Sequence, residues 1–187
     1  LTPFGQTLYL SPLKWVLMLA PLAFIFVFSM RMDRMSASSA RTMFWAFAAV
    51  MGASLSSLLL VFTGGSVVQV FFITAAAFGS LSLWGYTTRR SLSGMGSFLM
   101  MGLIGLVIAS LVNIFLGSSA LQFAISLIGV VIFTGLTAYD TQSIKEQYAE
   151  NWGEEANSKL AVFGALSLYL NFINLFQLLL NLTGERE

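Results

Sequence analysis

The chain has 187 residues, of which 57% are hydrophobic and only 9% are charged, with a formal net charge of +1. Because a soluble domain carries roughly a quarter charged residues, this composition excludes an ordinary soluble protein and predicts a surface that faces lipid. The chain contains no cysteine and no histidine, which excludes disulfides, thiol nucleophiles and imidazole catalysis. We therefore expect no enzyme activity and no bound cofactor, and the near-neutral charge gives no reason to expect nucleic acid as a partner.

Six stretches of the sequence are long and apolar enough to form helices that cross the roughly 30 Å hydrocarbon core of a bilayer. We predict an all-α polytopic membrane helix bundle with six spans, forming a single transmembrane helical domain over residues 1–187. The predicted spans lie near residues 13–31, 42–63, 66–87, 96–116, 120–140 and 160–182.

The basic residues between these spans are distributed unevenly. Seven of them lie in the three connections on one side: Arg31, Arg34, Arg41, Arg89, Arg90, Lys145 and Lys159. Only Lys14 and Arg186 lie on the other side. Since Lys and Arg concentrate in cytoplasmic loops, we predict a multi-pass protein whose basic loops are cytoplasmic and whose two chain ends, as given, are not.

Asp140 is the primary candidate for a functional residue, because every other acidic residue sits in a loop or a tail. It follows the apolar run from Leu127 to Tyr139, and ionisable groups at membrane depth usually face a bundle interior. Arg31 closes the first span on the same side, so that topology permits an ion pair between the two. A structural alternative stays open, in which Asp140 marks the end of a helix that continues into water and Arg31 extends to the headgroups.

Two amides lie near the middle of the last predicted span. Asn171 and Asn174 are three residues apart and therefore share one face of a helix, and an amide in hydrocarbon needs a hydrogen-bond partner. A role in packing and a role in a functional site explain this pair equally well. Four further amides lie nearer the span ends and give no reason to expect a special role: Gln69, Asn113, Gln122 and Gln177.

Two long motifs resemble a known family. Residues 135–142, with the sequence GLTAYDTQ, are followed by Ile144 and Lys145, and residues 165–176 have the sequence ALSLYLNFINLF. These runs, in this order, look like the last two helices of the Bax inhibitor-1 family, also called the transmembrane Bax inhibitor motif family. The likeness extends back to residues 28–31, FSMR, where the second helix of the family commonly ends in Arg. It implies a seven-helix fold with the last helix central, and we expect a bacterial member whose first helix is missing from this chain.

The resemblance also implies a gate. Relatives of this type have two aspartates on the last two helices, which share protons and are latched by an arginine of the second helix. Asp140 and Arg31 stand at the positions of the first aspartate and the arginine, whereas Asn171 stands in place of the second aspartate, and Ala20 replaces a further acid. Since a single carboxylate cannot titrate as a coupled pair, we expect pH sensing to be weakened. Thr137, Gln142 and Asn174 are the candidate supporting polar residues of this gate.

From the resemblance we expect a calcium or cation leak in the bacterial inner membrane, with Arg31, Asp140 and Asn171 as the gate or latch. Calcium prefers several oxygen ligands, with carboxylates among them. We therefore expect no stable metal site and only a weak, transient Ca²⁺ contact at Asp140. The alternative is an adaptor that regulates proteases or stress and cell-death signalling through contacts with membrane-protein partners. An intramembrane hydrolase is disfavoured, because Asp140 has no second acid, His or Cys to work with.

Overall fold

The computed structural model describes residues 24, 27–28, 30–31, 34–148 and 153–186 of the chain. Over these residues it is helical and contains no strand, apart from one isolated bridge between Phe62 and Arg186. The helices, in chain order, are α3 (Ala37–Leu55), the short 3₁₀ helix η2 (Ser56–Leu60), α4 (Gly64–Thr87), α5 (Ser93–Leu116), α6 (Ser119–Gln147) and α7 (Glu154–Thr183).

Local sequence signals explain where these helices begin and end. The hydroxyl groups of Ser36, Thr63 and Ser118 accept hydrogen bonds from backbone N–H groups in the first turns of α3, α4 and α6, respectively, as expected of N-cap residues. Gly117 has a φ of 60° and ends α5 in the left-handed conformation, which glycine adopts without steric cost.

The turn between α5 and α6 is also fixed by an amide. The side-chain nitrogen of Asn113 donates to Gln122 Oε1 at 3.1 Å, while its oxygen accepts from the backbone N–H of Ser118 at 3.0 Å. Asn113 and Gln122, for which the sequence predicted no special role, thus hold this turn closed.

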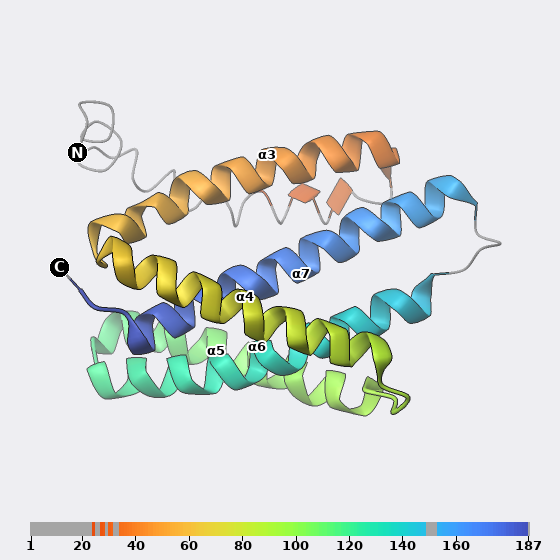
Figure 1. Cartoon of the computed structure of the whole chain (residues 1–187). Helices are drawn as coiled ribbons and strands as arrows, with labels where there is room; N and C mark the ends of the chain where they lie inside the picture. The colour runs from red at the N-terminus through yellow and green to blue at the C-terminus, as the bar shows by residue number, and fades with distance from the viewer. Residues whose placement is uncertain (1–23, 25–26, 29, 32–33, 149–152, 187) are drawn as a thin grey trace.

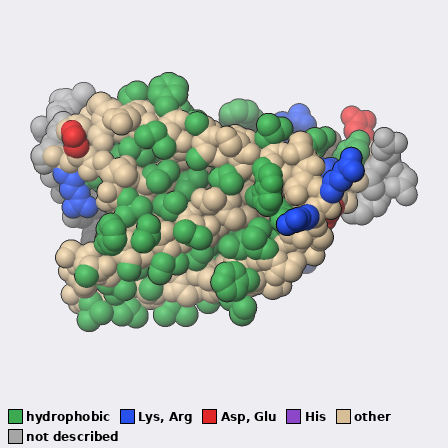
Figure 2. Space-filling model, turned by 60° about the horizontal axis from the view of Figure 1, so that its bottom comes forward, with side chains coloured by type: hydrophobic (Ala, Val, Ile, Leu, Met, Phe, Trp, Pro, Cys, Tyr) green, Lys and Arg blue, Asp and Glu red, His purple; other side chains and the backbone are tan. Residues whose placement is uncertain are grey.

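Five helical segments of the described structure are long and apolar enough to cross a membrane. Large hydrophobic side chains are exposed along α4 and α5, up to 89% for Phe115. Figure 2 shows a broad uncharged surface between charged side chains at the two ends of the molecule. Such a surface would be costly in water and is stable against lipid, so the chain is a multi-pass membrane protein.

The helix bounds differ from the predicted spans in two places. The predicted span 42–63 corresponds to α3 and η2, which together run from Ala37 to Leu60 and stop before Phe62. The predicted span 120–140 corresponds to α6, which continues to Gln147, where polar residues of its last turns bond to the last turn of α4 and to the connection between α4 and α5. Most of the predicted span 13–31 lies outside the described residues, and the prediction of six spans therefore stays a prediction.

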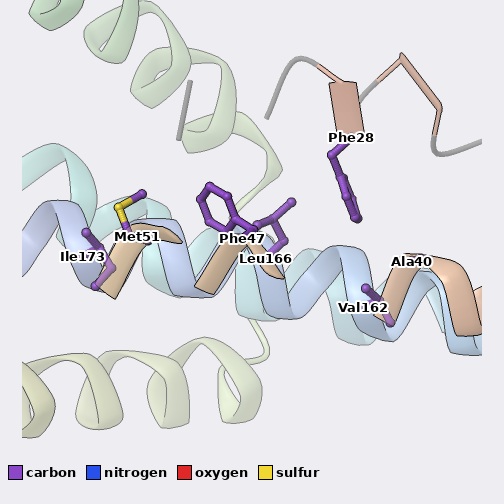
Figure 3. Packing of buried hydrophobic residues seen from close by; sticks show 7 residues of the cluster. All are labelled: Phe28, Ala40, Phe47, Met51, Val162, Leu166 and Ile173. Atoms are coloured by element: carbon purple, nitrogen blue, oxygen red, sulfur yellow. The ribbon is translucent and has the colours of Figure 1, made fainter. Parts of the chain in front are cut away.

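Helix α7 packs against α3, α4 and α6, and in Figure 1 it crosses between α3 and α6. The contact with α3 is an apolar cluster that Figure 3 shows at close range; its buried members are Phe28, Ala40, Phe47, Met51, Val162, Leu166 and Ile173. The Tyr169 ring meets the rings of Phe44 and Phe47 edge to face, a geometry that favours aromatic pairs. That the last helix is central to the whole bundle stays a prediction, because the first span lies largely outside the described residues.

Helices α4 and α6 approach each other most closely at Gly85. A Cβ atom at this position would collide with the carbonyl oxygen of Ala138 and lie 2.9 Å from two further backbone atoms of that residue. Glycine is therefore required here by the spacing of the two helices. This contact sets the position of α6 along α4 just before Asp140.

Candidate functional site

Asp140 lies in the interior of α6, which continues for two more turns. The preceding residues Leu136, Thr137 and Ala138 are buried, whereas Asp140 itself is half-buried. The alternative, in which α6 continues into water beyond Asp140, stays open, because Lys145, Glu146 and Gln147 in the last turn of α6 are exposed. The carboxyl group projects from a packed helix toward its neighbour α7.

Asn171 of α7 is the direct partner of Asp140. Its side-chain nitrogen donates a hydrogen bond to Asp140 Oδ2 at 2.7 Å, and the Asn171 side chain is only 6% exposed. The Ser167 side chain, one turn earlier on α7, also hydrogen-bonds this carboxyl group. Hydrogen bonds to an ionised carboxylate are short and comparatively strong, so the amide and the hydroxyl give Asp140 a polar environment at the junction of α6 and α7.

Asp140 lines a groove of about 580 Å³ between α5, α6 and α7. The α5 wall of the groove consists mainly of aliphatic side chains. The α7 wall carries a line of polar residues, which we call the polar stripe: Ser167, Asn171, Asn174, Gln177 and Asn181. Their spacing of four, three, three and four residues keeps them on one helix face. At 1.5 Å per residue the polar stripe is about 21 Å long, most of the thickness of a bilayer core.

Arg31 does not take part in this contact. Its side chain is exposed and lines a different hollow beside α3, together with Met35, Ser38 and Thr42. Within the described part of the chain, no hydrogen bond or ion pair joins Arg31 to Asp140. The structure therefore brings together two of the three residues predicted to form the gate, and a latching role for Arg31 stays a prediction.

The three candidate supporting residues have separate roles. Thr137 is fully buried and donates its hydroxyl proton to the backbone carbonyl of Phe133 on its own helix. Asn174 likewise donates to the carbonyl of Leu170 at 2.8 Å, while its side chain lines the groove. Of these, only Asn174 contributes to the polar stripe.

Gln142 points away from Asp140. Its side-chain oxygen accepts from the backbone N–H of Leu92 at 2.7 Å, and its nitrogen donates to the carbonyl of Arg90 at 2.9 Å. One turn further on, Lys145 donates to the carbonyl of Tyr86 at 2.6 Å and lies over the Tyr86 ring. These two α6 side chains, which we call the α6 clamp, tie the last turn of α4 and the connection between α4 and α5 to the end of α6.

Sequence reasoning missed three members of the polar stripe. Ser167 was not singled out, Gln177 was assigned no special role because it lies near a span end, and Asn181 was not considered. Their common signal is the helical spacing of polar residues through an apolar span, which is visible in the sequence. A polar face on a membrane helix must turn toward protein or water.

The fold and the site define a class: an all-helical, multi-pass membrane protein with a single carboxylate held by an amide between its last two helices. The chain belongs to the Bax inhibitor-1 family. The family model described as "Inhibitor of apoptosis-promoting Bax1" matches residues 2–187.

Bacterial relatives support this assignment. The chain is 51% identical to an uncharacterised protein of Caulobacter vibrioides over 96% of its own length and 72% of the relative's. It is 47% identical to protein RP147 of Rickettsia prowazekii, covering 99% of this chain and 78% of that one. It is 46% identical to the inner membrane protein YbhL of Escherichia coli strain K12, covering 91% and 74%, respectively.

Proposed function

We propose that this protein conducts cations, calcium among them, as a slow leak across a bacterial inner membrane. The observation that carries the proposal is the polar stripe of α7 in a groove that also receives the Asp140 carboxylate. Amide and hydroxyl oxygens can replace part of the water around a cation. A line of such groups lowers the cost of moving an ion past an otherwise apolar wall.

The composition of the groove favours weak binding over a stable site. Among the described residues that line it, only Asp140 is acidic, whereas tight calcium sites combine several carboxylates with other oxygen ligands. A single carboxylate near one end of the stripe attracts a cation without retaining it. Weak binding of this kind is what conduction requires, because an ion must leave as readily as it enters.

The location and orientation belong to the same proposal. The relative YbhL is named an inner membrane protein. The basic residues of the α4–α5 and α6–α7 connections support a cytoplasmic location for that end of the bundle under the positive-inside rule. Asp140 then lies toward the cytoplasmic end of the groove. We propose that Asp140 and Asn171 control the entry of cations from that side. Arg31 would act as a latch when its side chain comes within reach of Asp140.

The test is calcium efflux from liposomes that contain the purified protein and a calcium dye. We expect flux above that of empty liposomes in the parent, and reduced flux in Asp140→Asn, which keeps the shape of the side chain and removes its charge. Glu146→Gln is the matched control, since Glu146 is an exposed acid two turns from Asp140 on the same helix. Arg31→Ala tests the proposed latch, and altered flux would support it.

Two results would contradict this proposal, the first by excluding a leak and the second by excluding a role for Asp140 in it. One is a parent flux equal to that of empty liposomes. The other is equal flux in Asp140→Asn and Glu146→Gln, which would remove Asp140 from the pathway. The first result would favour the alternative of a membrane adaptor that regulates proteases or stress signalling, because an adaptor needs no polar route across the bilayer.

A further inference from the structure

A second polar hollow lies at the opposite end of the bundle from the α6 clamp. It has a volume of about 390 Å³ and is formed by the α5–α6 turn, the first turns of α6 and the end of the chain after α7. The residues that line it are Asn113, Gly117, Ser118, Ser119, Gln122, Phe123, Ser126, Asn181 and Arg186. We call it the α6 entrance hollow.

The α6 side of this hollow is polar over two turns. Ser119, Gln122 and Ser126 are spaced by three and four residues and thus share one helix face. Gln122 Oε1 accepts from Asn113, and the side-chain nitrogen of Gln122 adds two N–H donors. The first N–H groups of a 29-residue helix add further donors and a partial positive charge at the same end.

Ser126 gives independent evidence for a ligand. Its side chain is 1% exposed, and its hydroxyl has no hydrogen-bond partner in the described structure. By contrast, Ser110 and Ser80 bond to the carbonyls of Leu106 and Ala76 on their own helices. Ser82 of α4 is also buried without a partner, but it does not line this hollow. A buried hydroxyl without a partner is costly in hydrocarbon, and a polar ligand in the hollow would supply the missing bond.

Arg186 sets the sign of the charge. Its backbone is paired with Phe62, and its guanidinium group lies 5.6 Å from the centre of the Phe62 ring, so that the cation is held beside the hollow. None of the described residues that line the hollow is acidic. A guanidinium group, a helix N-terminus and neutral donors together match the oxygens of a phosphate.

We propose that the α6 entrance hollow binds a phosphate-type anion, which in the membrane is the phosphodiester headgroup of an acidic phospholipid. The hollow lies at the end of the spans, where lipid headgroups meet the protein. The exposed apolar side chains of Ile114, Phe115 and Leu116 lie next to it on α5 and offer a surface for the acyl chains. The proposal does not depend on the leak, because it concerns binding at a different hollow.

The test measures lipid retained by the purified chain in neutral detergent, by native mass spectrometry, with phosphatidylglycerol and phosphatidylcholine offered at matched concentrations. We expect preferential binding of phosphatidylglycerol in the parent and a loss of affinity of about tenfold in Arg186→Gln, as for a hydrogen bond to a charged group. Ser126→Ala should weaken binding several-fold while leaving Arg186 in place. Arg89→Gln, an equal change of charge at the other end of the bundle, should have no effect.

Competition with inorganic phosphate distinguishes a site for free phosphate from a site for a lipid headgroup. Displacement of phosphatidylglycerol by phosphate from the parent would support a phosphate site open to free anions, whereas retention of the lipid under the same conditions would support the headgroup as the ligand. Equal retention of the two lipids by the parent would overturn the proposal. Equal losses in Arg186→Gln and Arg89→Gln would also overturn it, because they would show a general effect of charge.

Discussion

The close approach of α4 and α6 at Gly85 gives a sharp test of the packing. In Gly85→Ala, the new methyl group meets the backbone of Ala138, which cannot rotate away as a side chain would. Overpacking of this kind typically costs about 1–3 kcal/mol, and the upper end applies against backbone. The greater helix propensity of alanine offsets about 1 kcal/mol of this loss. We expect a net loss of about 2 kcal/mol in the free energy of unfolding.

Gly79 provides the matched control, since it lies on the same helix and a Cβ added there has no neighbour within 4 Å. Gly79→Ala should therefore gain up to about 1 kcal/mol from helix propensity alone. The measurement is unfolding of each variant in mixed micelles by titration with sodium dodecyl sulfate, followed by circular dichroism. Equal unfolding free energies for the two variants would show that α4 and α6 do not meet at Gly85 and Ala138.

Three further outcomes are expected. Asn171→Leu should destabilise the protein by about 1–2 kcal/mol, because the hydrogen bond to the Asp140 carboxylate is lost. Asn174→Leu should be close to neutral, because the Asn174 amide bonds to its own helix. The same detergent titration measures both variants, and a larger loss for Asn174→Leu would contradict the pairing of Asn171 with Asp140. Gln142→Leu should speed amide hydrogen exchange at Leu92, because the acceptor of that N–H is removed, and unchanged exchange there would contradict the bond. Calcium efflux from proteoliposomes should vary less between pH 6 and pH 8 than for a two-aspartate relative, since one carboxylate cannot form a coupled pair, and an equal response would refute this reasoning.

Much of the fold follows from composition and span length. The helical segments from α3 onward arise because lipid forces every backbone N–H and C=O group to bond within its own segment, so that long apolar runs have no other stable structure. The turn between α5 and α6 can also be predicted from the sequence, because glycine commonly ends a helix and serine commonly starts one, as Gly117 and Ser118 do here. A continuation of α6 beyond Asp140 was one of the alternatives that the sequence left open. The partners that Gln142 and Lys145 find on Arg90 and Tyr86 could not be predicted, because these residues lie more than 50 positions earlier in the chain.

The candidate site was predicted in part. The pairing of Asp140 with Asn171 was expected from the resemblance, and the structure has the two side chains in a direct hydrogen bond. Whether Arg31 pairs with Asp140 or extends away from it was left open by the sequence, because sharing one side of the membrane does not fix the rotation of a helix or its distance from a neighbour. Gln142 illustrates the same limit: its position two residues after Asp140 turns its side chain toward another part of the bundle.

The α6 clamp has a mechanical consequence. Sliding or rotation of the end of α6 relative to the α4–α5 connection would break both bonds of the Gln142 amide, which is only 4% exposed and would find no water to replace them. At this end α4, α5 and α6 therefore form one stiff unit, and Asp140 is mounted on it. If the space around the carboxylate opens or closes, we therefore expect α7 to move relative to that unit.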